Sequence, residues 1–152
     1  MNKNLKIDKL EISQVNYLVD GFKKWFTKNN SEIDEAFLLS LAKDMYESED
    51  TEIFSLKECN SIVGVFYIVE LKEEIEISGG MIESSKSINN AYFVFDFCRN
   101  VAHHKKISSI KIRVIKKHYK YEALLRLYLR YGFSIVNIDE NSISLSLKLT
   151  SP

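Results

Sequence analysis

The chain of 152 residues has the length of one ordinary domain and can bury most of the surface that its unfolded form exposes. Its composition, 45% hydrophobic and 28% charged with 21 basic and 21 acidic residues, excludes a wholly disordered chain. The sequence has no run of about 18 apolar residues and no apolar signal core at its start, so we expect one domain over residues 1–152 and no membrane partner. Cys59 and Cys98 match neither a disulfide framework nor a metal spacing, which favours a reducing, cytoplasmic location.

The first half of the chain predicts one strand, two helices and a block of three strands. Leu5 to Ile12 is a short strand, after which Ser13 can cap a helix with one apolar face. A second helix starts at Ser31, and its buried face is expected to contain Ile33, Phe37, Leu41 and Met45. Strands follow at 51–57, 62–71 and 74–82, and the first two are joined by a hairpin turn in which Asn60 suits a positive φ.

The second half predicts two further helices and three further strands. Helical spacing runs from Ala91 to about His104 and again from Tyr119 to Tyr131, where Gly132 suits a C-terminal cap. Strands are expected at 107–115, 133–138 and 143–149. The resulting order, β-α-α-β-β-β-α-β-α-β-β, predicts an α/β (α+β) fold with a central mixed, mostly antiparallel sheet flanked by helices.

Charge is distributed unevenly although the formal net charge is zero. Between Lys105 and Arg130 nine basic residues face one acidic residue, Glu122. This segment suits an anionic ligand near one face, and an ordinary solvated basic face is the alternative. Nucleic-acid binding is a third reading, which the zero net charge and the absence of a recognition motif disfavour.

Three local features resemble the GNAT superfamily of acyl-CoA-dependent N-acyltransferases, and so does the order of elements along essentially the whole chain. Leu127-Tyr128-Leu129-Arg130-Tyr131-Gly132-Phe133 is similar to the L-Y-x-K-x-G-F helix end of that family, and Ile62-Val63-Gly64-Val65-Phe66 resembles its third strand. The family usually has Asn six residues before the Leu, whereas Tyr121 stands there in this chain. That departure removes an expected polar contact near the cofactor.

The third feature is a degenerate version of the family's pyrophosphate loop, Q/R-x-x-G-x-G/A, at Lys86-Ser87-Ile88-Asn89-Asn90-Ala91. Successive backbone N–H groups at a helix N-terminus bind phosphate, and glycine lets the backbone curl around it. Asn89 replaces the first glycine but tolerates positive φ, and Lys86 supplies charge without the fork of an arginine. The resemblance therefore implies acetyl-CoA or a related acyl-CoA as cosubstrate, and no metal.

The resemblance also implies direct attack of an acceptor amine on the thioester. A bulge at Gly79-Gly80 would free a backbone N–H of Met81 or Ile82 to bind the acyl carbonyl. Tyr128 is the candidate general acid, and a core tyrosine on an amphipathic helix is its alternative. Glu76 is the candidate base, with a solvent-facing strand residue as the alternative.

Two functions remain open on these residues. The first is an N-acetyltransferase, or another N-acyltransferase, acting on a small-molecule or peptide amine. The second is a catalytically inactive GNAT-like binding or regulatory domain, which the degenerate loop and Tyr121 favour. Exposed edge strands make a homodimer an additional expectation. His103-His104 are expected to be solvated, since adjacent helix residues do not face each other.

Overall fold

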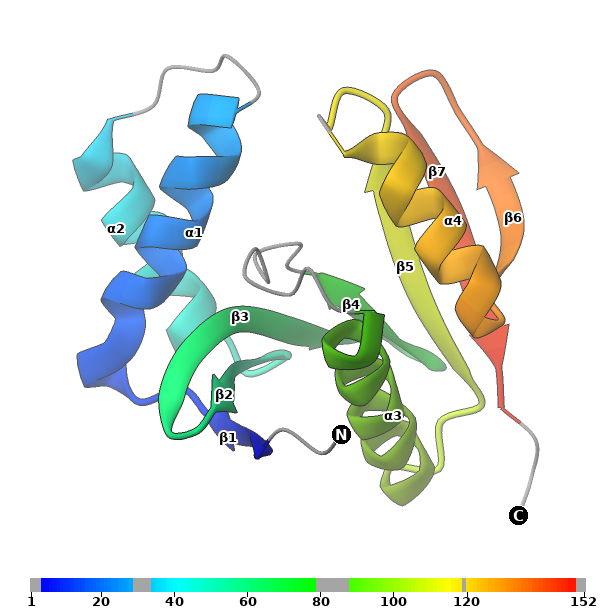
Figure 1. The fold of residues 1–152 in the computed structure, drawn as a ribbon, viewed down its shortest axis with the longest axis horizontal. Helices are drawn as coiled ribbons and strands as arrows, with labels where there is room; N and C mark the ends of the chain where they lie inside the picture. The colour runs from blue at the N-terminus through cyan, green and yellow to red at the C-terminus, as the bar shows by residue number, and fades with distance from the viewer. Residues whose placement is uncertain (1–3, 29–33, 79–87, 119, 150–152) are drawn as a thin grey trace.

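The computed structural model describes residues 4–28, 34–78, 88–118 and 120–149 (Figure 1). Within them seven strands form one sheet in the order β1-β2-β3-β4-β5-β7-β6. The parallel pair is β4–β5, and the neighbouring strands are otherwise antiparallel. This mixed, mostly antiparallel sheet with flanking helices confirms the predicted fold class.

The N-terminal elements are β1 (Leu5–Lys9), the 3-10 helix η1 (Ile12–Gln14), α1 (Val15–Lys28) and α2 (Glu35–Glu47). The predicted caps were wrong at both helices. Glu11 and Gln14 form a capping box around η1. Ser13 therefore lies inside η1 and is not the cap of a helix. At α2 the cap is Asp34, whose carboxylate accepts a hydrogen bond from the Ala36 N–H at 3.2 Å.

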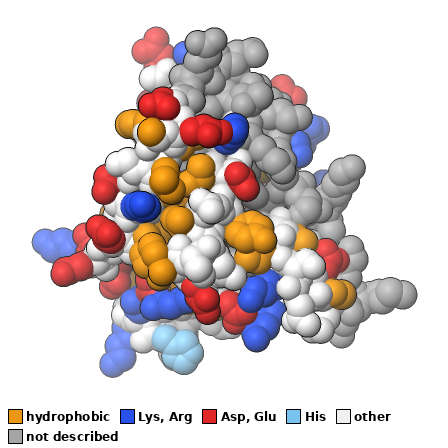
Figure 2. Space-filling view, turned by 90° about the vertical axis from the view of Figure 1, so that its left-hand side faces the viewer, with side chains coloured by type: hydrophobic (Ala, Val, Ile, Leu, Met, Phe, Trp, Pro, Cys, Tyr) orange, Lys and Arg blue, Asp and Glu red, His pale blue; other side chains and the backbone are white. Residues whose placement is uncertain are grey.

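The buried face of α2 lies one residue further along than the sequence predicted. Leu38 and Ala42 are buried, whereas Phe37 is 56% exposed and Leu41 is half-buried. Met45 packs against the cluster that contains Ala42, as predicted, and Ile33 lies outside the described residues. One residue corresponds to about 100° of rotation around a helix, and the run Ala-Phe-Leu-Leu offers apolar residues on two neighbouring faces. On the side formed by α1 and α2, hydrophobic side chains lie among charged ones (Figure 2).

The central strands are β2 (Thr51–Glu58), β3 (Ser61–Glu70) and β4 (Glu74–Ser78). Cys59 and Asn60 form the β2–β3 turn, both with positive φ (51° and 69°), as predicted for Asn60. The C-terminal part contains α3 (Ile88–His104), β5 (Ser109–Ile115), α4 (Tyr121–Tyr131), β6 (Ser134–Ile138) and β7 (Ser142–Lys148). Gly132 ends α4 with φ 129°, which confirms it as the cap.

Two hydrophobic clusters occupy opposite faces of the sheet. One joins α3 and α4 to the inward residues of β2 to β5 and β7, and includes Ile75, Ile77, Ile112 and Leu145. The other joins α1 and α2 to Ile53 and Val65. Because side chains alternate along a strand, each strand residue contributes to one cluster only. Figure 1 shows α1 and α2 side by side at one end of the sheet and α3 and α4 over the remainder.

Candidate active site

The parallel strands β4 and β5 part at one end. Among the described residues, their pairing runs from Glu74–Ser109 to Ile77–Ile112, while β5 continues to Ile115 paired with β7. Figure 1 shows the two strands diverging from this point. The described part of β4 ends one residue after this pairing, at Ser78.

The first turn of α3 contains part of the predicted pyrophosphate loop. Ile88, Asn89, Asn90 and Ala91 of the predicted loop belong to the helix, which begins three residues earlier than expected. Asn89 consequently does not have the positive φ that we expected for a glycine substitute, because its hydrogen-bonded helical turn fixes the right-handed conformation. The helix still presents its first N–H groups, which have no intrahelical partner. Lys86 and Ser87, together with Met81, Ile82 and Gly79-Gly80, lie outside the described residues.

Asn90 is the residue of this turn whose environment the sequence did not reveal. Its side chain is 2% exposed, and its Oδ1 receives no hydrogen bond from the described part of the chain. A buried carbonyl oxygen without a donor costs about 1–3 kcal/mol.

Tyr128 is buried within the α3/α4 cluster, where Ala91 and Ile77 also lie. It is 7% exposed, and its ring stands edge-on to Phe95 at 5.7 Å and tilted to Phe133 at 6.1 Å. Burial raises the pKa of its phenol from 10.0 to about 12. Its hydroxyl has no hydrogen-bond partner among the described residues. Tyr128 therefore remains protonated at neutral pH, as a proton or hydrogen-bond donor.

Glu76 lies on the other face of β4 and is not a free solvent-facing residue. Its carboxylate is 3.9 Å from Lys111 Nζ and 3.6 Å from an Arg113 guanidinium nitrogen, both on β5. The side chain is 23% exposed. Nearby, Ser78 Oγ donates a hydrogen bond to Tyr67 Oη at 2.9 Å. Glu76 is thus paired with two cations, Lys111 and Arg113, on this face of the sheet. Both belong to the basic segment Lys105–Arg130 that the sequence indicated.

Tyr128 and Glu76 are therefore on opposite faces of the sheet, next to the strands that diverge. Ile75 and Ile77 belong to the cluster of Tyr128, and Glu76 alternates away from it.

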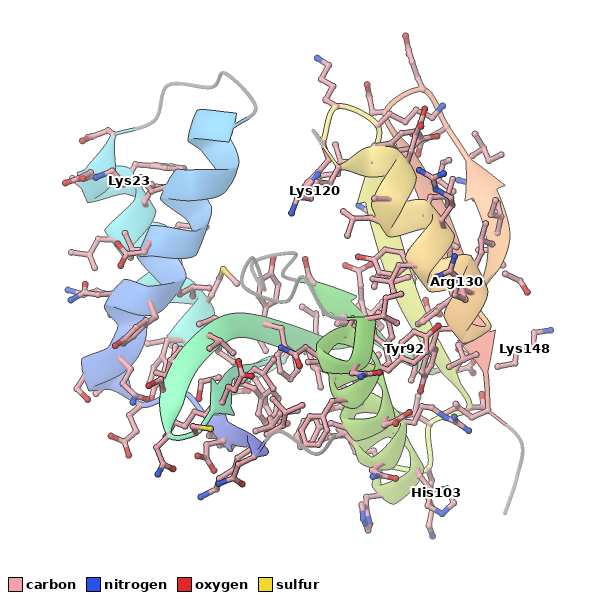
Figure 3. The ribbon with its side chains drawn as sticks, viewed as in Figure 1. Lys23, Tyr92, His103, Lys120, Arg130 and Lys148 are labelled. Atoms are coloured by element: carbon pink, nitrogen blue, oxygen red, sulfur yellow. The ribbon has the colours of Figure 1, made fainter. Side chains whose placement is uncertain are left out.

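Tyr121 is the first residue of α4 and packs half-buried against the α3/α4 cluster. The turn before it contains His118, which sequence reasoning missed. Its Nδ1 accepts a hydrogen bond from the Lys120 N–H at 2.9 Å. Burial, and secondarily the charge of Lys120, lowers the pKa of His118. Figure 3 shows Lys120 at the start of α4, on the side that faces α1.

A separate cleft of about 380 Å³ lies at the other end of α3, lined by Asp96, Arg99, Asn100, His103 and Leu149. Beside it, Tyr131 Oη donates a hydrogen bond to Asp96 Oδ1 at 2.5 Å. Figure 3 shows His103 at this end of the helix, where His103 and His104 are both exposed, as expected. None of the predicted site residues lines this cleft.

Within the described ranges, no three His, Cys, Asp or Glu side chains come together as a potential metal site. None of the helices described is both long enough and apolar enough to cross a membrane. Of the two cysteines, Cys59 is exposed at the β2–β3 turn and Cys98 is buried in α3.

No family model matches the sequence, and no curated protein matches it either. The structure is similar to several solved N-acetyltransferases. The N-acetyltransferase PseH of Campylobacter jejuni in complex with acetyl coenzyme A is 18% identical, with a TM-score of 0.69, and the match covers 96% of this chain and 99% of that one. Spermidine N-acetyltransferase of Vibrio cholerae in complex with CoA and spermine is 11% identical, with a TM-score of 0.75, over 99% and 98% of the two chains.

An acetyltransferase of the GNAT family from Staphylococcus aureus is 14% identical, with a TM-score of 0.75, over 96% of this chain and 99% of that one. At such identities the likeness concerns the fold. It extends over nearly the whole of each chain, in agreement with the order of elements and the Leu127–Phe133 motif. This chain has the GNAT fold.

Proposed function

We propose that the protein is an acyl-CoA-dependent N-acyltransferase, most simply an N-acetyltransferase, that acts on a small-molecule or peptide amine. The observation that carries this proposal is the placement of buried Tyr128 on one face of the sheet and of Glu76 on the other, beside strands β4 and β5, which diverge in its described part. Acyl-CoA supplies an acyl thioester, whose carbonyl carbon the amine attacks with release of the CoA thiol.

The α3/α4 face holds the donor in this proposal. The first N–H groups of α3, from Ile88 to Ala91, bind the pyrophosphate with the help of the helix dipole. Asn90 Oδ1 accepts a hydrogen bond from the pantetheine arm. Lys86 and Ser87 complete the phosphate site, and an N–H of Met81 or Ile82 binds the acyl carbonyl. A preorganised N–H donor at that oxygen contributes about 3 kcal/mol to transition-state stabilisation.

Tyr128 assists the departure of the thiol by donating a hydrogen bond. With the pKa of Tyr128 at about 12 and that of a thiol about 8.5, complete proton transfer to the thiolate is uphill by about 5 kcal/mol. A hydrogen bond that stabilises the developing thiolate avoids this cost, and the proton reaches the sulfur from solvent afterwards. Burial keeps Tyr128 protonated throughout, as this role requires.

Glu76 accepts the amine proton, directly or through a water molecule. An amine that reaches its carboxylate also comes close to Lys111 and Arg113. These cations repel a second positive charge and attract a carboxylate or phosphate on the acceptor. The proposed acceptor is therefore an amine with an anionic or neutral polar group nearby, rather than a polyamine.

Calorimetric titration with acetyl-CoA tests the donor site first. Absence of binding at millimolar acetyl-CoA would refute the enzyme, whereas binding without thiol release from any amine would identify the chain as a binding or regulatory domain. Asn90→Ala is expected to weaken acetyl-CoA binding about tenfold, the effect of losing one hydrogen bond to a buried partner. Unchanged affinity would remove Asn90 from the site.

Two matched pairs of variants test the chemistry by thiol release. Tyr128→Phe should lower turnover more than affinity, while Tyr131→Phe in the same helix should leave turnover nearly unchanged. Glu76→Gln should lower turnover about 100-fold, in the range of a lost general base, while Glu74→Gln on the same face of β4 should not. Equal effects within either pair would reject the assigned role.

A further inference from the structure

The cleft at the far end of α3 collects charged and polar side chains from one face of that helix. Asp96, Arg99, Asn100 and His103 stand at positions i, i+3, i+4 and i+7, which share one helix face. Leu149, which follows β7, adds an apolar side chain to the lining. The volume of about 380 Å³ lies near the lower end of the range for ligand sites, about 300–1,000 Å³. The cleft therefore has room for one small molecule.

A tyrosine hydroxyl of α4 joins the two opposite charges of this cleft. Tyr131 Oη donates a hydrogen bond to Asp96 Oδ1 at 2.5 Å. The Arg99 guanidinium donates a hydrogen bond to the same hydroxyl, which raises the pKa of Arg99. Tyr131 is half-buried, and its ring packs against Phe95 with 4.8 Å between the ring centroids. One anion and one cation are thus held a single hydroxyl group apart.

Both charged side chains keep hydrogen-bonding capacity for a ligand. In the described part of the chain, neither Asp96 nor Arg99 forms an ion pair with another residue. Asp96 has a second carboxylate oxygen, and Arg99 carries five N–H donors, more than the Tyr131 oxygen can accept. Both side chains are exposed. A small molecule can therefore reach one anionic and one cationic group at the same time.

We propose that this cleft binds a free α-amino acid with an aliphatic side chain. The carboxylate of the ligand pairs with the planar fork of Arg99, and its ammonium group pairs with Asp96. An α-amino acid carries both charges on one carbon atom, which matches the short separation of Asp96 and Arg99 across the Tyr131 hydroxyl. The aliphatic side chain lies against Leu149. A simple anion would be repelled by Asp96 and a simple amine by Arg99, so the cleft selects ligands that carry both charges.

This site is separate from the proposed donor site and does not depend on acyl transfer. Asp96 lies roughly 9 Å along the helix axis from Asn90, and the cleft extends from there away from the first turn of α3. Figure 3 shows His103 at the opposite end of the helix from that turn. The described residues that line the cleft include neither Tyr128 nor Glu76. An amino acid can therefore occupy it whether or not acyl-CoA binds.

Calorimetric titration of the protein without acetyl-CoA tests the class of ligand. The probes are L-leucine, isocaproate, which lacks the ammonium group of leucine, and isoamylamine, which lacks its carboxylate. We expect L-leucine to bind and each of the other two to bind at least about tenfold more weakly, the effect of losing one charge-assisted interaction. Absence of L-leucine binding at millimolar concentration, or equal affinity for the three probes, would overturn the proposal.

Variants of the two charged residues locate the bound amino acid. Arg99→Gln and Asp96→Asn should each weaken L-leucine binding at least about tenfold, and both keep a side chain that can hydrogen-bond to Tyr131. Arg126→Gln changes an exposed arginine of α4 outside the cleft and should leave the affinity unchanged. Wild-type affinity in Arg99→Gln, or an equal loss in Arg126→Gln, would overturn the site.

An amino acid is also an amine with an anionic group, the kind of molecule proposed above as the acceptor, so the two sites must be told apart. Arg113→Gln changes the cation beside Glu76 and leaves the cleft intact. Weaker L-leucine binding in Arg99→Gln but not in Arg113→Gln supports the cleft, even for a chain that fails to bind acetyl-CoA. The reverse result would place L-leucine at Glu76, which overturns the cleft and leaves the proposed acyl transfer standing.

Discussion

Replacing Tyr128 by phenylalanine removes one oxygen atom from the α3/α4 face and leaves the ring between Phe95 and Phe133 in place. Because no hydrogen bond joins that hydroxyl to another of the described residues, its removal at pH 7 should change the free energy of unfolding little. Lower turnover together with undiminished stability would therefore be the signature of a functional hydroxyl.

The magnitude follows from the pKa of the phenol. It is 10.0 when exposed, as in the unfolded chain, and about 12 in the folded protein. The folded state thus holds the proton more tightly, and the associated stability is fully present below pH 10 and is lost as the pH rises from 10 to 12. Two pKa units correspond to about 3 kcal/mol, which is the loss expected once the pH is well above 12.

Urea denaturation at pH 7, 10, 11 and 12, followed by the fluorescence of the single tryptophan, measures this loss. By pH 12 the wild type should have lost about 2 kcal/mol more than Tyr128→Phe. Parallel pH profiles of the two proteins would refute the reasoning, because they would mean that Tyr128 ionises equally easily in the folded and unfolded chains.

Three further predictions concern the framework of the site. Leu145→Ala, at a position that is 0% exposed, should lower the free energy of unfolding by about 2–5 kcal/mol in urea denaturation; a loss below 1 kcal/mol would mean that the cluster closes around the cavity. Gly132→Ala should cost about 1–2 kcal/mol through its φ of 129° alone, since the added Cβ meets only Leu147 Cδ1 at 3.6 Å; an unchanged melting temperature would contradict this. The lowered pKa of His118 means that its contribution to stability is present above the unfolded pKa of 6.5 and is lost as the pH falls below that value. The melting temperature of His118→Gln should therefore fall less between pH 7 and pH 5 than that of the wild type. An equal fall in both proteins would show that His118 does not cause the acid destabilisation.

The order of elements was predictable because apolar spacing changes between two and about 3.6 residues at each boundary. Asn60 and Gly132 were predictable for a local reason, since few residues adopt positive φ easily. The buried face of α2 was not, because Phe37 and Leu38 are adjacent and both apolar, and only packing against the sheet selects Leu38.

The site was partly predictable on the same grounds. Alternation along β4 placed Glu76 on the face opposite Ile75 and Ile77, as found. Its ion pairs with Lys111 and Arg113 join segments about 35 residues apart and depend on which strands become neighbours. The first turn of α3 was mistaken for a loop because its sequence is polar and asparagine has a low helix propensity, which the packing of Ala91 and Val94 in the core overrides.

The division of the sheet into two independently packed faces has a consequence for how this protein can change during evolution. Substitutions in α1, α2 and the outward residues of β4 alter one face and leave the cluster around Tyr128 untouched. The layer that we assign to the donor can therefore stay constant while the opposite layer diversifies. A chain built in this way can acquire a new acceptor without rebuilding its core.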